Sequence, residues 1–104
     1  MLFAYDFIDL KVSDAAADAL TQELRRLPFR GVVGVQWGLD LTTQKYSWDV
    51  GFYERKDVPR EGLQEIRGIP FVFNQGPLSK RLSGKLLDNN DSGFVVIDPV
   101  AGAK

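Results

Sequence analysis

The sequence predicts a mainly β protein of the α+β class, with one helix near the N-terminus followed by about six short strands. Several short segments alternate apolar and polar residues, which is the pattern of strands that bury one face. A single stretch has apolar residues at helical spacing instead. The chain has 104 residues, 44% of them hydrophobic, which suits one domain with a real core. We therefore expect residues 1–104 to form a single domain.

The first segment alternates in two phases. Phe3, Tyr5 and Phe7 share one parity, whereas Ile8, Leu10 and Val12 share the other. We expect a strand extension over residues 1–7 that could form an edge or a subunit interface, and a bulge near residues 7 and 8.

The helix is predicted from its start and stop signals. Ser13 and Asp14 can cap it, and Ala16, Leu20 and Leu24 follow at helical spacing. Arg25 and Arg26 suit the negative end of the helix dipole, and Pro28 ends the helix.

Two long strand patterns come next, separated by a polar connection. Residues 31–38, "GVVGVQWG", are apolar and glycine-rich, and residues 46–55 alternate regularly. In the second pattern Tyr46, Trp48, Val50 and Phe52 share one face. We expect residues 39–45 to connect the two strands.

The last third predicts two hairpins and a helical turn. Residues 63–66 and 69–73 flank Arg67-Gly68, a hairpin-turn signal. Residues 78–82 could form one helical turn, and "DNNDSG" is a dense turn signal before a strand over residues 94–97. We expect residues 100–104 to form a short tail.

The residues that the chain lacks restrict its chemistry most. It has no cysteine and no histidine, which removes thiolate nucleophiles, disulfides, Cys/His zinc sites and histidine acid–base pairs. Thirteen basic and fourteen acidic residues give a net charge of -1, so no excess positive charge points to nucleic acid or to an anionic membrane. The N-terminus does not resemble a signal peptide, and we expect a cytoplasmic protein.

A calcium loop is the one metal motif that the sequence suggests. Asp88, Asn90, Ser92 and Gly93 fit the first half of an EF-hand loop. The twelfth position, where a bidentate acid is required, is Pro99, and a strand replaces the second helix. We expect a plain hairpin turn and no metal or other cofactor.

The aromatic residues around the polar connection form the candidate binding site. Trp37, Tyr46 and Trp48 flank it, and Asp40 lies within it. These residues could pack in the core, form a subunit interface, or line a pocket for a small organic molecule. The sequence leaves the three alternatives open.

Taken in order, several short motifs resemble one known family. They are "IDLKVSDAAADALTQEL" with Gly34-Val35, then Gly68, Ser79, Leu82, Gly84, Leu87-Asp88, Gly93-Phe94 and Asp98-Pro99. Over residues 8 to 99 the chain resembles HesB-like domains, the A-type iron–sulfur carriers. The resemblance implies a compact barrel or sandwich of short strands with one helix, often dimeric or tetrameric.

The same resemblance implies a function that this chain cannot perform in the usual way. The family holds its cluster with one cysteine in the glycine-rich loop and two in a Cys-Gly-Cys tail after an Asn-Pro. Here the loop position falls within residues 38–43 and contains no cysteine, the asparagine is Asp98, and "PVAGAK" follows. We expect a HesB-like scaffold without cluster ligation.

Three functions remain open at this stage. The first is a non-enzymatic binding or interaction protein, expected to be a homo-oligomer such as a dimer, with a protein client or small organic ligand. The second is a small-molecule receptor or small enzyme that uses the aromatic residues with Asp40, Asp49 or Arg55. The third is residual iron handling through carboxylates.

Overall fold

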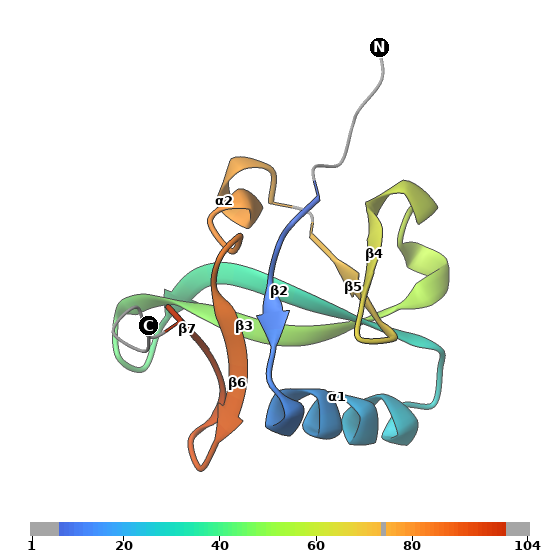
Figure 1. Ribbon diagram of the computed structural model, residues 1–104, viewed down its shortest axis with the longest axis horizontal. Coiled ribbons are helices and arrows are strands. Elements are labelled where there is room, and N and C mark those ends of the chain that lie inside the picture. Colours follow the sequence, from blue (N-terminus) through green and yellow to red (C-terminus); the bar gives the residue numbers. More distant parts are fainter. Residues whose placement is uncertain (1–6, 74, 100–104) are drawn as a thin grey trace.

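The computed structural model describes residues 7–73 and 75–99, and these fold into two β-sheets with one main helix (Figure 1). The predicted α+β class, mainly β with one N-terminal helix, is confirmed. Within the described residues the two sheets remain separate and do not close into a barrel.

The larger sheet has the strand order β3-β2-β5-β4. Strands β2 (Gly31–Asp40) and β3 (Lys45–Glu54) form a long antiparallel hairpin that runs across the molecule in Figure 1. Strand β5 (Ile69–Val72) pairs parallel with β2 and antiparallel with β4 (Leu63–Ile66). Two short 3₁₀ turns, η1 (Arg55–Asp57) and η2 (Arg60–Gly62), connect β3 to β4.

The smaller sheet joins the two ends of the described chain. Strand β1 (Lys11–Val12) pairs parallel with β6 (Leu86–Asn90), and β6 pairs antiparallel with β7 (Gly93–Ile97). Helix α2 (Pro77–Lys80) lies between β5 and β6 in the chain, where the single helical turn was expected.

Helix α1 (Asp14–Arg26) follows the predicted signals. The Ser13 hydroxyl accepts a hydrogen bond from the Ala16 backbone N–H at 3.1 Å, and Arg25 and Arg26 occupy the last turn. Ala16 and Leu20 are fully buried and join the core with Val33 and Phe71. The helix therefore buries one stripe against the core, as its spacing predicts.

Two turns are shorter than the sequence predicts. Strand β2 continues to Asp40 and β3 begins at Lys45, so only residues 41–44 form the expected polar connection. Likewise β6 runs to Asn90, and Asp91 and Ser92 alone form the turn within "DNNDSG". Cross-strand pairing extends strands through residues that by themselves favour turns.

The N-terminal strand expected over residues 1–7 falls almost wholly outside the described residues, and Phe3 and Tyr5 with it. Phe7 is described: it is not in a strand, and it is 74% exposed. In the part of the chain that the structure describes, no helix is long and apolar enough to cross a membrane.

A polar junction ties α1 to the smaller sheet. The Ser13 hydroxyl donates a hydrogen bond to Asp88 Oδ1 at 2.5 Å, and the Asn89 backbone N–H donates to the same oxygen at 2.8 Å. These two hydrogen bonds hold the pKa of Asp88 below its ordinary value, against a small opposing effect of burial.

This junction predicts a pH-dependent loss of stability. Because the folded-state pKa of Asp88 is lowered, its carboxylate stabilises the fold above the unfolded value, about 3.9, and that contribution disappears as the pH falls through the folded value. We expect Asp88→Asn to lower the urea midpoint at neutral pH and to differ less from the wild type below about pH 4. Urea unfolding of Asp91→Asn, at an exposed turn position, is the control. If the difference in urea midpoint between Asp88→Asn and the wild type stays constant with pH, the Asp88 carboxylate does not make this contribution to stability.

Candidate functional site

The distal end of the β2–β3 hairpin brings three of the predicted site residues together. Trp37 and Trp48 are direct cross-strand partners, and Leu39 pairs with Tyr46. Side chains that pair directly across an antiparallel ladder lie on the same face of the sheet. Trp37, Leu39, Tyr46 and Trp48 therefore share one face.

The three aromatic rings contact each other in series. The Trp37 and Trp48 ring centroids are 5.1 Å apart with their planes at 62°, an edge-to-face contact. The Trp37 and Tyr46 centroids are 6.1 Å apart, and these planes are nearly parallel, at 12°. Trp37 thus packs between the other two rings.

Burial decreases along this face toward the hairpin turn. Val33 and Val35 are buried, and Trp48, Val50 and Phe52 pack against the core cluster. Further out, Leu39 is 46% exposed, Tyr46 is 62% exposed and Leu41, in the turn, is 81% exposed. The hairpin is longer than the core that it covers. We call Trp37, Leu39, Leu41 and Tyr46 the hairpin-end patch.

Asp40 is not brought into this cluster. It lies one residue beyond Leu39 and so belongs to the opposite face of β2. Its carboxylate accepts hydrogen bonds from the Thr42 backbone N–H at 2.8 Å and the Thr43 backbone N–H at 3.4 Å. In this structure Asp40 orders the turn, and its role as a binding group stays a prediction.

Gln75, which sequence reasoning did not select, holds the backbone of Trp37 in place. The Trp37 backbone N–H donates to Gln75 Oε1 at 2.7 Å, and Gln75 Nε2 donates to the Trp37 carbonyl at 3.2 Å. The Gln75 backbone N–H in turn donates to the hydroxyl of the buried Ser79. The backbone of β2 is therefore hydrogen-bonded at Trp37 as well as along its short pairing with β5.

Strand β7 lies beside the same hairpin. It contacts β3, and its last residue, Ile97, is 41% exposed (Figure 1). Just beyond it, the carboxylate of Asp98 accepts a hydrogen bond from Lys85 Nζ at 2.5 Å. The hairpin that carries residues 38–43 and the last described strand are therefore neighbouring elements, whereas the tail that the resemblance associates with the other two cluster ligands lies outside the described residues.

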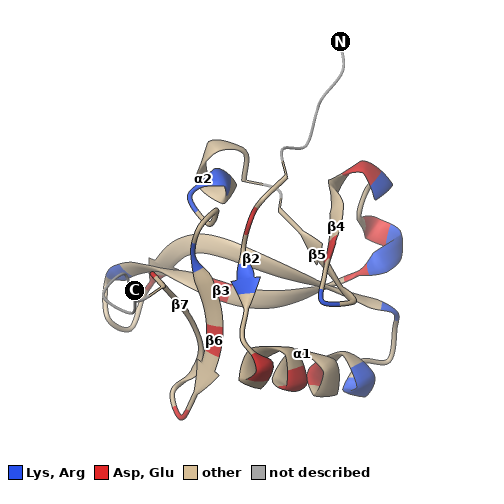
Figure 2. Ribbon diagram, in the orientation of Figure 1, with Lys and Arg blue, Asp and Glu red and all other residues tan. Residues whose placement is uncertain are grey.

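Charged and metal-binding features are sparse at this end. Figure 2 shows acidic and basic residues interspersed over the elements rather than gathered by sign. Among the described residues no three acidic side chains cluster so as to hold a metal ion. Asp49, one of the polar groups considered for the site, lies on the face opposite Trp48.

Comparisons with protein-family models and with curated proteins find no match. Function must therefore be argued from the structure. Sequence reasoning selected the aromatic residues but missed the exposure of Leu39 and Leu41, because a leucine in a polar connection does not show which way it faces.

The burial gradient predicts that the two ends of the aromatic face respond differently to truncation. Trp48→Ala removes a ring that packs against the core, and we expect a loss of about 2–4 kcal/mol in the free energy of unfolding. Leu41→Ser should change it by less than about 0.5 kcal/mol, because the side chain is already in solvent. Guanidinium unfolding of both variants measures the difference. Equal losses of unfolding free energy in Trp48→Ala and Leu41→Ser would show that the patch belongs to the core rather than to the surface.

Proposed function

We propose that this protein is a non-enzymatic interaction module on a HesB-like scaffold that has lost iron–sulfur ligation, and that it works as a homodimer through the hairpin-end patch. The exposure of large apolar side chains at one end of a long hairpin carries the proposal. Clustered apolar side chains in solvent are typical of interaction sites. The proposal includes the cytoplasmic location expected because the N-terminal sequence does not resemble a signal peptide.

The arrangement of elements supports the scaffold part of the proposal. Strand, helix, two hairpins, a helical turn and a final hairpin occur in the order expected from the resemblance. Three of the matching glycines, Gly68, Gly84 and Gly93, have φ of 78°, 86° and 104°. Positive φ is where glycine is favoured over other residues. The matching leucines, Leu82 and Leu87, are fully buried.

The lost ligation follows from side-chain chemistry. Clusters are held by cysteine thiolates, with histidine as an occasional substitute, and the sequence contains neither residue. Two acidic side chains near these segments are also engaged within the fold: Asp40, within the loop segment, orders its turn, and Asp98, which stands where the family has asparagine, pairs with Lys85. Residual iron handling through carboxylates gains no support from the described residues, where no acidic triad forms.

A second copy of the chain suits the hairpin-end patch. In a two-fold interface each residue i meets residue j of the partner while j meets i, so a surface must complement itself. The patch is apolar, and the nearest acid and base, Asp40 and Lys45, are cross-strand partners on the opposite face of the hairpin. A contact between two copies through the patch therefore rests on its apolar side chains, which can meet the same side chains of a second copy.

Self-association is tested by sedimentation velocity and native mass spectrometry. We expect a species of twice 11.6 kDa, without bound metal, that dissociates in the double variant Leu39→Lys/Leu41→Lys. Like charges placed on both copies of an isologous contact repel across the axis. Circular dichroism checks that the variant keeps its secondary structure.

Phe7→Ser provides the matched comparison, because Phe7 is exposed like the substituted Leu39 and Leu41 and belongs to the N-terminal interface that the sequence suggests. Dissociation by Phe7→Ser but not by the double lysine variant would move the interface to the N-terminal segment. A monomer at every concentration would overturn the dimer.

A second candidate is binding of a flat organic molecule at the aromatic cluster. The near-parallel Trp37 and Tyr46 rings favour it, since exposed aromatic faces stack on planar ligands. Under this alternative Trp37, Tyr46 and Trp48 supply the stacking surface.

Saturation-transfer NMR with benzamide tests this candidate, with cyclohexanecarboxamide as the non-aromatic control. Stacking predicts transfer to benzamide alone and its loss in Tyr46→Ser. Equal transfer to both compounds, or an unchanged signal in the variant, would reject it.

A further inference from the structure

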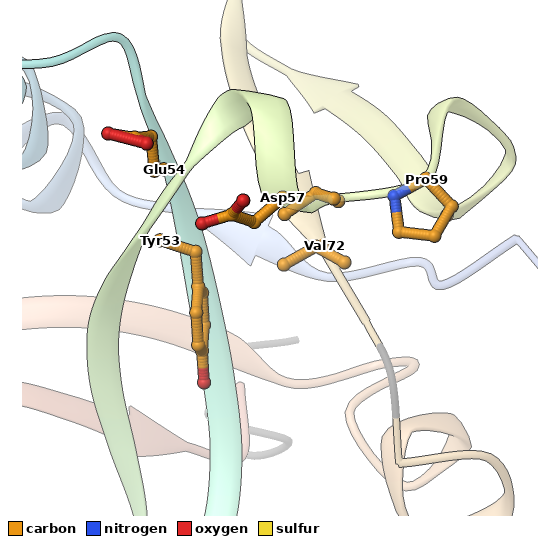
Figure 3. A pocket seen from close by; sticks show the side chains of 7 residues that line it. Tyr53, Glu54, Asp57, Pro59 and Val72 are labelled. Carbon is orange, nitrogen blue, oxygen red and sulfur yellow. The ribbon is translucent and has the colours of Figure 1, made fainter.

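A cavity of about 220 Å³ opens at the opposite end of the β2–β3 hairpin from the patch. The end of β3, the η1 and η2 turns and β5 surround it, with Tyr53, Asp57, Val58, Pro59 and Val72 among its lining residues (Figure 3). Pockets for drug-sized ligands hold roughly 300–1,000 Å³, so this one suits a smaller molecule.

The walls are apolar and the charge is negative. Val58, Pro59 and Val72 supply aliphatic surface, and Val72 is 4% exposed. Two carboxylates, Glu54 and Asp57, are the charged groups of the lining. A ligand that fills this cavity should therefore combine an alkyl part with a positive charge.

The two carboxylates are not equivalent. Glu54 forms an ion pair with Lys56 at 3.2 Å, and Figure 3 shows its side chain pointing away from Asp57. The Asp57 carboxylate is directed toward Tyr53 and makes no hydrogen bond or ion pair with any other described residue. Asp57 is thus the carboxylate available to a ligand.

The Tyr53 ring of the cavity lining rests closely against the neighbouring strand. A Cβ at Gly34 would lie 2.3 Å from Tyr53 Cε2, so the ring rests against β2 only because residue 34 is glycine. Gly51, the cross-strand partner of Gly34, has no atom within 4 Å of the corresponding position. The aromatic wall is therefore held in place by a specific backbone approach.

The cavity rim is also constrained. The Val58 backbone N–H donates to the Arg55 carbonyl at 3.2 Å, and the Gly62 backbone N–H donates to the Pro59 carbonyl at 3.0 Å. Pro59 itself has restricted backbone freedom. A preformed rim lowers the entropy that binding must overcome.

We propose that this cavity binds a small alkylammonium cation. Its ammonium group meets the Asp57 carboxylate and the face of Tyr53, and its alkyl chain lies against Val58, Pro59 and Val72. A charge-assisted hydrogen bond and a cation–π contact recognise the head, and apolar burial recognises the chain. This site is separate from the hairpin-end patch and does not depend on the proposed dimer.

Titration of the ¹⁵N-labelled protein with n-butylammonium chloride tests the proposal by NMR. We expect saturable shifts at amides lining the cavity, with weaker binding of 1-butanol and of butyrate. Asp57→Asn should raise the Kd about 10-fold, since it removes the charged acceptor while keeping the shape. Asp91→Asn, the same exchange in an exposed turn, should leave the Kd unchanged.

A second pair of variants tests the aromatic wall. Gly34→Ala pushes against the Tyr53 ring and should weaken n-butylammonium binding, whereas Gly51→Ala, on the facing strand, should not. The ¹⁵N spectra themselves report whether each variant remains folded. The proposal is overturned by the absence of saturable shifts, by equal affinity for butanol, by shifts confined to the hairpin-end patch, or by an Asp57→Asn protein that binds as well as Asp91→Asn.

Discussion

Strand β2 is the element on which the rest of the structure depends. It pairs with β3 on one side and with β5 on the other, and Val32 and Val33, which point to opposite faces, are both fully buried. Around these two residues the strand is covered on both faces and paired at both edges, which gives it one stable register, because a one-residue slip would exchange its faces. Helix α1 and β5 pack on this strand, and β3 takes its position and length from it.

The length of the β2–β3 hairpin then creates the surface features. Ten residues on each strand exceed what the core can cover, so the apolar face of the hairpin is buried at Val33 and Val35 and exposed at Leu39 and Tyr46. At the opposite end the chain leaves β3 through two 3₁₀ turns, which do not close tightly on β5, and the cavity remains between them. The hairpin-end patch and the cavity are therefore consequences of one strand pair.

Under the proposed relation to HesB-like domains, the residues that support the fold differ from those that hold the iron–sulfur cluster. The side chains that support the scaffold are packing leucines and glycines at positive φ, and none of them takes part in metal ligation. A chain can thus keep such residues without any cluster ligand, and here Asp40 serves its turn and Asp98 pairs with Lys85.

The sequence by itself determined the elements whose signals are local. Ser13, the helical spacing and Pro28 define α1, Arg67-Gly68 defines a hairpin, and the lack of cysteine and histidine excludes whole classes of chemistry. Tertiary structure alone decided the strand ends at Asp40 and Asn90, the separation of Asp40 from the three rings, and the meeting of Tyr53 with Gly34 and Asp57. These depend on which strands become neighbours and on how far the core extends, and both are set by contacts between residues distant in the chain.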